Sequence, residues 1–372
     1  MKAKLSLLIL CLIFFSCATP GPLHDRGVCL PHFPDRDGWY GGDGAYSIDL
    51  DEQRTLWLFG DTFASSESAR TNRAGMDIIS GNTLAISTCN ADGFHIRYYL
   101  KKRDGRFASF FGDDETLWPQ SPFLAERALL IPLLEIKPLP DKEPPFNFRI
   151  AGHKIAYIRN FSAKDPMSWR VEELDWSQEI DAGIDALAPA SVVFQHRVYF
   201  FSLYRAGNKA GNILARLSLA RLDHPAGAFE YLHDDGGWEN RIDPKRIKIL
   251  FTEGLSELSV RYDPQKRRWI AVYLNPENKG RRVLYRVAPH LDGPWSSPGT
   301  LFETIPEVDP QSPQYHPKTF CYAGKEHARF SSAQSLIVTY VCNSSEDPTD
   351  PESFIARHLF LYRPVVLQIP AP

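Results

Sequence analysis

Residues 39–63 read WYGGDGAYSIDLDEQRTLWLFGDTF, and this stretch decides the fold. An apolar segment at 45–50 is followed by a polar turn at 51–54 and by a second, more hydrophobic segment at 55–59. Short apolar runs bounded by Gly, Asp and other turn residues are typical of β-strands. The stretch therefore predicts an antiparallel hairpin whose second strand is the more deeply buried.

The same layout recurs four more times along the chain. Strand, turn and hydrophobic strand are predicted at 123–124, 126–127 and 128–136; at 191–194, 195–197 and 198–204; at 258–262, 263–268 and 269–274; and at 318–322, a longer turn through 333, and 336–341. Further strands are predicted between these hairpins, at 83–87, 155–159, 213–219, 282–287 and 359–362.

Five units of four strands predict an all-β fold, a five-bladed β-propeller. Helix signals are nearly absent, and the 29 prolines agree, because proline is poorly tolerated inside helices. Two stacked sheets are the alternative, which explains the strands but not the repeated hairpin. Within the second unit, residues 101–117 and 137–150 are expected to be long loops that line a cleft.

The N-terminus is typical of an exported protein. Lys2 and Lys4 precede an apolar run at 5–15, which has the length of a signal-peptide core and is too short to span a bilayer. The following Ser-Cys pair resembles a bacterial lipobox, in which Cys17 is diacylated and becomes the first residue, although two Phe residues precede the pair. The alternative is ordinary cleavage near Thr19.

These signals divide the chain into three parts. We expect a signal peptide at 1–16, a lipid-anchor cysteine and tether at 17–35, and a single propeller domain at 36–372. The expected location is the bacterial cell envelope, with the protein lipid-anchored in the periplasm or on the surface, or else secreted. Contact with the membrane is expected through the lipid anchor only.

Composition argues against nucleic acid as a partner and is compatible with a carbohydrate. The net charge of −3 and the isoelectric point near 6.4 give no basic footprint for nucleic acid. The short basic clusters at 101–103 and 266–268 are expected to be solvated loops. The 8 Trp and 15 Tyr residues would suit a cleft for a polysaccharide or oligosaccharide, although aromatic-rich strands give the same count.

The cysteines fit export as well. After Cys11 and Cys17, four cysteines remain, an even number that permits two disulfides in an oxidising compartment. Cys321 and Cys342 lie on neighbouring strands of one predicted hairpin, so we expect them to pair, which leaves Cys29 for Cys89. No two cysteines and no histidines have metal-ligand spacing, and we expect no metal and no cofactor.

Two aspartates of the quoted stretch are candidate catalytic groups. Because the strands are antiparallel, Asp43 at the start of the first is expected to lie beside Asp61 at the end of the second. Gly41, Gly42 and Gly44 leave room for a ligand to approach the backbone. Two neighbouring carboxylates push their pKa values apart, which suits glycoside cleavage. Alternatively, both aspartates cap turns.

The sequences at 42–47 (GDGAYS) and 56–62 (LWLFGDT) resemble the signature of domain-of-unknown-function family 4185. That family is similar to five-bladed propeller glycosidases and includes the endo-D-arabinanases of glycoside hydrolase family 183. The segments 256–262 (SELSVRY), 315–317 (YHP) and 336–343 (LIVTYVCN) resemble its fourth and last blades more weakly. The resemblance implies a catalytic aspartate pair at Asp43 and Asp61 and leaves the substrate open.

Other candidates are single residues near the predicted inner strands. Glu257 is a third carboxylate that could act as an acid or adjust the pKa of its neighbours, and Glu253 is its rival. Candidate substrate-binding residues, each with a structural alternative, are Trp39, Tyr40, Asn82, Asp185 and His316.

The sequence thus predicts an exported glycoside hydrolase, endo-D-arabinanase-like, that acts on a polysaccharide such as an arabinan-like furanoside. The alternative is a non-catalytic glycan-binding or cell-envelope lipoprotein that kept the propeller fold.

Overall fold

The computed structural model describes residues 29–125, 127–142 and 147–372. The predicted signal peptide and Cys17 lie outside the described residues. In the described part, no helix is both long and apolar enough to cross a membrane.

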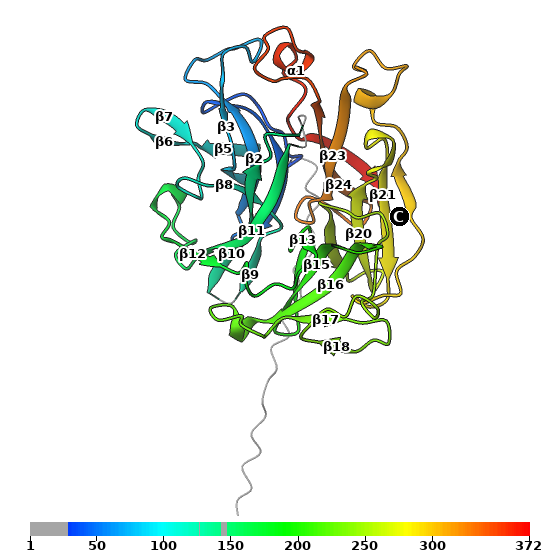
Figure 1. The fold of residues 1–372 in the computed structure, drawn as a ribbon. Helices are drawn as coiled ribbons and strands as arrows, with labels where there is room; N and C mark the ends of the chain where they lie inside the picture. Colours follow the sequence, from blue (N-terminus) through cyan, green and yellow to red (C-terminus); the bar gives the residue numbers. More distant parts are fainter. Residues whose placement is uncertain (1–28, 126, 143–146) are drawn as a thin grey trace, which may run out of the picture.

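Five antiparallel sheets surround one axis, which confirms the five-bladed β-propeller (Figure 1). The first sheet contains β1 (Trp39–Asp49), β2 (Arg54–Ala64), β3 (Asp77–Ile79), β4 (Thr83–Asn90) and β5 (Gly93–Tyr99). The second contains β8 (Thr116–Pro119), β9 (Phe123–Ala125), β10 (Ala128–Pro138), β11 (Phe148–Ile158) and β12 (Val171–Asp175). The third contains β13 (Ile184–Ala186), β14 (Ser191–Phe194), β15 (Arg197–Ala206), β16 (Lys209–Ser218), β17 (Glu230–Leu232) and β18 (Trp238–Glu239).

The last two sheets are smaller. The fourth contains β19 (Ser259–Asp263), β20 (Arg268–Leu274), β21 (Val283–Ala288) and β22 (Gly299–Phe302), and the fifth contains β23 (Thr319–Glu326), β24 (Ser335–Ser344) and β25 (Val365–Pro370). The helical segments are η1 (Pro166–Ser168), η2 (Leu219–Arg221), η3 (Glu277–Lys279), η4 (Pro306–Val308) and α1 (Phe354–Arg357).

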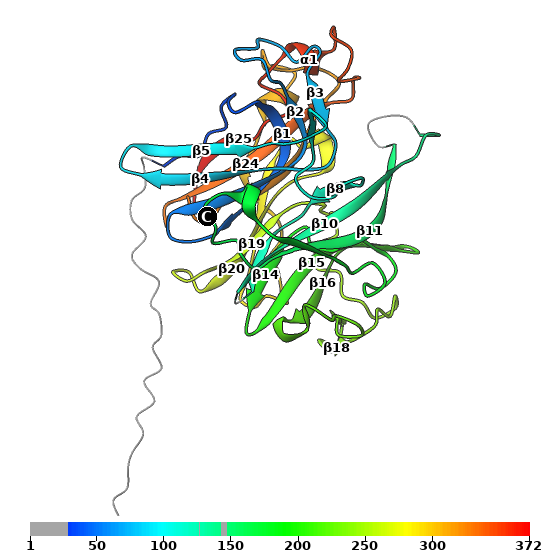
Figure 2. The same cartoon turned by 90° about the vertical axis from the view of Figure 1, so that its left-hand side faces the viewer.

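The strands nearest the axis share one direction. β9, β14, β19, β23 and β1 follow one another around the axis, and each continues into an antiparallel partner through a turn at the same end. We call the end where these inner strands begin the front face and the end where they finish the back face. The β4–β5 turn and the β19–β20 turn lie on the back face, on the left of Figure 2.

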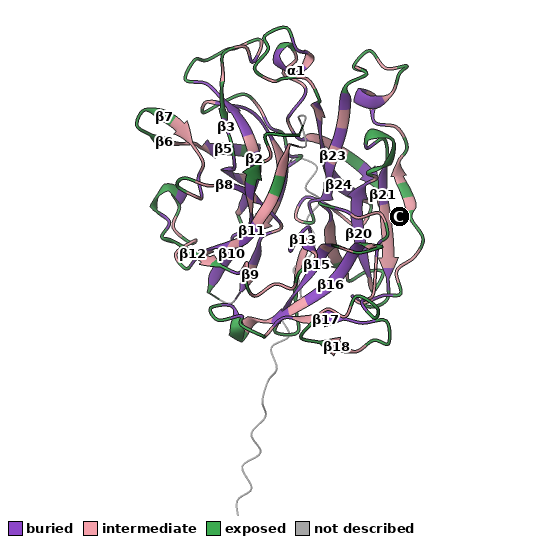
Figure 3. Cartoon of the chain, in the orientation of Figure 1, coloured by how far each residue is buried: buried purple, intermediate pink, exposed green. Residues whose placement is uncertain are grey.

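Hydrophobic clusters fill the spaces between neighbouring sheets. Sheets one and two, two and three, three and four, and four and five each share a cluster of buried side chains, and a fifth cluster joins the last sheet to the first. The second strand of each predicted hairpin is buried along most of its length, as Figure 3 shows for β15 and β20. The ring is therefore closed by side-chain packing.

Some details of the predicted strands and loops are wrong. Residues 359–362 form no strand, because their carbonyl groups bind a buried arginine and the last strand begins only at Val365. The fifth sheet consequently has three strands in place of four. Residues 101–117 are also more than a loop, since they contain the hairpin of β6 (Lys101–Arg103) and β7 (Arg106–Ala108).

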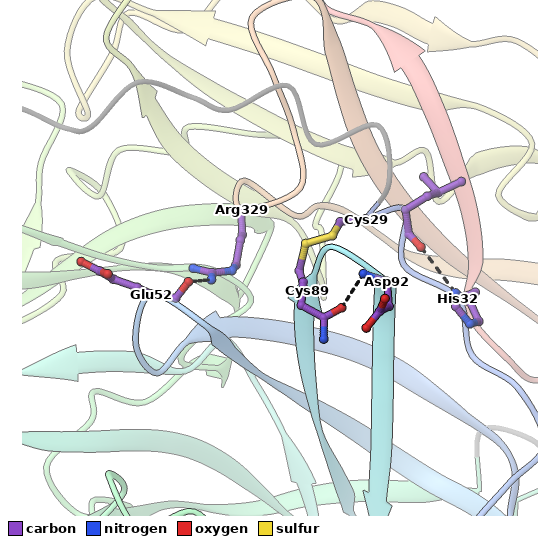
Figure 4. Close-up of a disulfide and its surroundings, with 8 residues drawn as sticks. Cys29, His32, Glu52, Cys89, Asp92 and Arg329 are labelled. Carbon is purple, nitrogen blue, oxygen red and sulfur yellow. Dashed lines mark hydrogen bonds between the residues drawn. A yellow bond between two sulfur atoms is a disulfide. The ribbon is translucent and has the colours of Figure 1, made fainter.

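Both predicted disulfides are present. Cys321 and Cys342 are directly paired across β23 and β24. Cys29 is joined to Cys89 near the end of β4, which fastens the N-terminal segment to the back face (Figure 4). Near this disulfide, Arg329 donates to the carbonyl oxygen of Glu52 and holds two back-face turns together.

Candidate active site

The hairpin of β1 and β2 is irregular where the two predicted aspartates lie. Gly42 is paired with Thr62 and Gly44 with Phe59, so Asp43 faces an extra residue on the partner strand. The bulge confirms that the start of the first strand lies beside the end of the second. Gly44 and Ala45 both have positive φ angles, 83° and 53°, and such bulges turn a side chain away from the regular pleat.

Gly60 makes room for the carboxylate of Asp43. A Cβ atom on Gly60 would lie 2.3 Å from Asp43 Oδ1, far inside van der Waals contact. The Asp43 side chain therefore lies directly over the backbone of the neighbouring strand. Gly60 thus makes space for the carboxylate of Asp43, and the next residue is the second aspartate, Asp61.

Asp43 is only partly exposed, and its carboxylate is surrounded by charge. The phenol of Tyr322 donates a hydrogen bond of 2.7 Å to Asp43 Oδ2. Burial raises the pKa of Asp43 to about 7, helped by the negative charges of Asp61 and Glu257, although Tyr322 and Lys325 act in the opposite direction. Asp43 can therefore hold or release a proton near neutral pH.

Asp61 carries two hydrogen bonds on one oxygen. Its Oδ1 atom accepts from the backbone N–H of Gly81 at 2.7 Å and from Trp118 Nε1 at 2.9 Å. Burial raises the pKa of Asp61, while these two donors lower it because they stabilise the ionised form. No hydrogen bond is recorded on its second oxygen, Oδ2, among the described residues.

Glu257 comes from the loop before β19 and faces a buried lysine. Lys325 Nζ lies 3.0 Å from Glu257 Oε1, and it also donates to the carbonyl oxygens of Gly44 and Ala323. Burial lowers the pKa of Lys325, and the charge of Glu257 opposes this effect. The lysine side chain is only 2% exposed, so one cation balances part of the negative charge of three carboxylates.

A loop from the fifth sheet completes the surroundings of Asp43. Tyr362 has a φ of 53°, and burial together with the charge of Asp43 raises the pKa of its phenol well above the usual value. The buried guanidinium of Arg73 holds this loop, because it donates to the carbonyl oxygens of Tyr40, Ile355, His358, Leu359 and Leu361. Arg73 thus fixes the approach of Tyr362 to the site.

Three predicted substrate-binding residues are buried, which favours the structural alternative for each of them. Trp39 is fully covered and stacks on Tyr98 with ring centroids 4.4 Å apart. Tyr40 is also buried and donates its hydroxyl hydrogen to the carbonyl oxygen of Glu67. Asn82 is inaccessible, because its amide binds the backbone of Phe111 and Leu117.

Asp185 and His316 have structural partners. Asp185 lies on β13 at the front face, with its carboxylate 3.3 Å from the guanidinium of Arg205. His316 precedes β23 by three residues, and its ring stacks on Phe354 at 4.3 Å. A role for either residue in substrate binding stays a prediction. Glu253, the rival of Glu257, is bound to Tyr273 and Arg286.

Four residues around the two aspartates were not predicted as site residues from the sequence: Tyr322, Lys325, Trp118 and Tyr362. The turn predicted after residue 322 is wrong, because β23 continues to Glu326 through an irregularity between Tyr322 and Lys325. The available signal was Lys325, a charged residue on the same strand as the disulfide-bonded Cys321. Trp118 lies on β8, directly after the segment 101–117 predicted as loop, and no local pattern points to its bond with Asp61.

Across the three described ranges, no group of three or more His, Cys, Asp or Glu side chains is arranged to hold a metal ion.

Solved structures share the fold. A protein of Bacteroides ovatus, provisionally named a hydrolase, matches at 16% identity over 89% of this chain and 86% of its own, with a TM-score of 0.66. A GH62 α-L-arabinofuranosidase of Coprinopsis cinerea matches at 11% over 92% and 94% (TM-score 0.44), and an exo-β-1,3-galactanase of Phanerochaete chrysosporium at 10% over 89% and 60% (TM-score 0.48). The first likeness shows the fold alone, and the other two are too distant to add to it.

A family model identifies the chain more directly. The search of curated proteins found no match to this chain. The model that matches is that of DUF5005, a domain of unknown function, over residues 31–370. The expected membership of family 4185 is not confirmed, and a relation to endo-D-arabinanases stays a prediction. The chain belongs to the DUF5005 family.

Proposed function

We propose that this protein is an exported glycoside hydrolase whose candidate catalytic groups are Asp43 and Asp61. One observation carries the proposal. At the front face, burial and the negative charges of Asp61 and Glu257 raise the pKa of Asp43 to about 7. Glycoside cleavage needs one protonated and one ionised carboxyl group, and this arrangement supplies both near neutral pH.

The surroundings of each carboxyl group assign its role. Asp43 remains largely protonated up to about pH 7 and serves as the acid that donates a proton to the glycosidic oxygen. Asp61, with Oδ1 held by two donors, offers its other oxygen to activate water or attack the sugar. Glu257 is held by Lys325, and its charge adds to burial and to the charge of Asp61 in raising the pKa of Asp43.

The substrate class is proposed from the sequence resemblance. The motifs around Asp43 and Asp61 favour an arabinan-like furanoside polysaccharide. The likeness in fold to the Bacteroides ovatus protein, which bears the name of a hydrolase, is compatible with this proposal. A carboxyl separation of about 5 Å would imply a retaining reaction, and about 6.5–9.5 Å an inverting one.

The decisive experiment is an activity screen with matched variants. Wild-type protein, Asp43→Asn, Asp61→Asn and the back-face control Glu172→Gln are incubated with arabinans, other furanosides and bacterial wall polysaccharides. Release of new reducing ends by wild type and Glu172→Gln, with at least about a 100-fold loss in both Asp variants, is expected. Oligosaccharide binding without any cleavage would support the non-catalytic alternative, and full activity of both Asp variants would refute the assignment.

We also propose that the protein is anchored in the bacterial cell envelope through an acylated Cys17. The lipobox-like sequence before this residue supports the proposal. Mass spectrometry of the membrane fraction should find acylated Cys17 as the first residue. A free N-terminus at any other position would contradict the anchor.

A further inference from the structure

Large apolar side chains are exposed mainly on one face of the propeller. Among the described residues, seven large hydrophobic side chains are 36–48% exposed, and six belong to back-face connections or to the strand ends that flank them: Leu30, Met167, Val171, Val193, Phe194 and Tyr262. The seventh, Ile78, lies on β3, which pairs with the front-face end of β2. Exposed large apolar side chains are therefore concentrated at the back face.

Two of these side chains form an aromatic ridge with a third ring. Phe194, at the β14–β15 turn, and Tyr262, at the end of β19, both contact Trp269 on β20, with ring centroids 5.5 and 5.3 Å apart. The turns of two neighbouring sheets thus present aromatic surface at the same place. Aromatic rings with a polar tip, such as Tyr262, suit the boundary between water and lipid.

The N-terminal segment enters the propeller at this same face. Cys29 is fastened to Cys89 near the β4–β5 turn (Figure 4). The exposed residue Leu30 follows Cys29 directly in the sequence. Eleven residues lie between Cys17 and Cys29, and the twelve Cα–Cα steps from one cysteine to the other span at most about 43 Å. An anchor at Cys17 would therefore hold Cys29 within about 43 Å of the bilayer.

We propose that the back face of the propeller rests on a lipid bilayer, with the aromatic ridge of Phe194 and Tyr262 at the lipid–water boundary. The front face, with Asp43 and Asp61, then points away from the membrane toward long, soluble substrates. This proposal rests on the anchor proposed at Cys17: the chain enters the propeller at the back face, so an acylated Cys17 would bring a lipid surface to this face, which favours a bilayer over a second copy of the chain or a protein partner.

Environment-sensitive fluorophores can test this orientation. A fluorophore is attached to Phe194→Cys, to Tyr262→Cys and to the matched front-face control Ile78→Cys, each in the full chain. Each protein is mixed with vesicles of phosphatidylethanolamine and phosphatidylglycerol. We expect a blue-shifted, brighter emission at positions 194 and 262 and no change at position 78.

A partition measurement gives a second readout. The double variant Phe194→Ser/Tyr262→Ser should partition onto these vesicles at least about tenfold more weakly than Ile78→Ser, because two apolar side chains lose burial in lipid. Equal emission changes at all three positions would overturn the proposal. An unchanged emission at positions 194 and 262, in protein that floats with the vesicles, would overturn it as well. Absence of vesicle binding, or a concentration-dependent change without lipid, would overturn it too.

Discussion

Replacement of Asp43 by Asn should stabilise the folded protein at alkaline pH while it removes activity. The ionised carboxylate of Asp43 is unfavourable in its site, because burial and the charges of Asp61 and Glu257 raise its pKa from 3.8 to about 7. An asparagine side chain keeps the shape and can still accept the hydrogen bond from Tyr322. It carries no charge at any pH.

The size and sign of the effect follow from linkage. Between about pH 4 and pH 7 the folded state holds a proton on Asp43 that the unfolded state has released, so the stability of the wild type falls as the pH rises. The full cost above pH 7 is on the order of 4 kcal/mol, since one pKa unit corresponds to about 1.36 kcal/mol. The variant escapes this cost, so its advantage is absent below about pH 4 and complete above about pH 7.

Urea unfolding at about pH 4 and about pH 8 measures this difference. A suitable control is Asp51→Asn at the back face. Burial tends to raise the pKa of Asp51, but hydrogen bonds from Arg54 and Gln53 lower it below its usual value. The loss of this carboxylate should therefore destabilise the protein at pH 8. If Asp43→Asn is instead less stable than wild type at pH 8, the aspartate is a turn cap. A gain of equal size at both pH values would show that Asp43 does not titrate in this range.

Three further predictions concern the supports of the fold and site. Gly60→Ala should displace the carboxylate of Asp43 and lower activity at least about 100-fold, while the circular dichroism spectrum shows that the fold is retained. Unchanged activity would mean that the position of the Asp43 carboxylate is unimportant. Arg73→Lys should cost about 3 kcal/mol in thermal or urea unfolding, because an ammonium group cannot serve five carbonyl oxygens, and an unchanged midpoint would contradict this. Loss of the disulfide through Cys321→Ser/Cys342→Ser should cost about 3 kcal/mol for a loop of 21 residues, and free thiols in the wild type would show that the strand register is wrong.

The repeated hairpin made the fold predictable from local sequence. Each unit pairs a mixed strand with a more hydrophobic one, and the second strand must be buried between neighbours, so that five such units close a ring. The same reasoning placed Asp43 beside Asp61, because antiparallel pairing turns 18 residues of sequence into neighbouring strand positions. The prediction failed at residues 359–362, where Arg73, nearly 290 residues earlier, captures the carbonyl groups that a strand would have paired.

The sequence by itself determined the strand order, the two disulfides and the neighbouring aspartates, because alternation, turn residues and pairing direction are local properties. Only the tertiary structure decided which side chains face the site. It buried Trp39 and Asn82, and it brought Lys325 and Tyr322 from the last sheet to the carboxylates of the first and fourth. The protonation state of Asp43 depends on these contacts, since burial and nearby charge are set by segments that meet only when the ring closes.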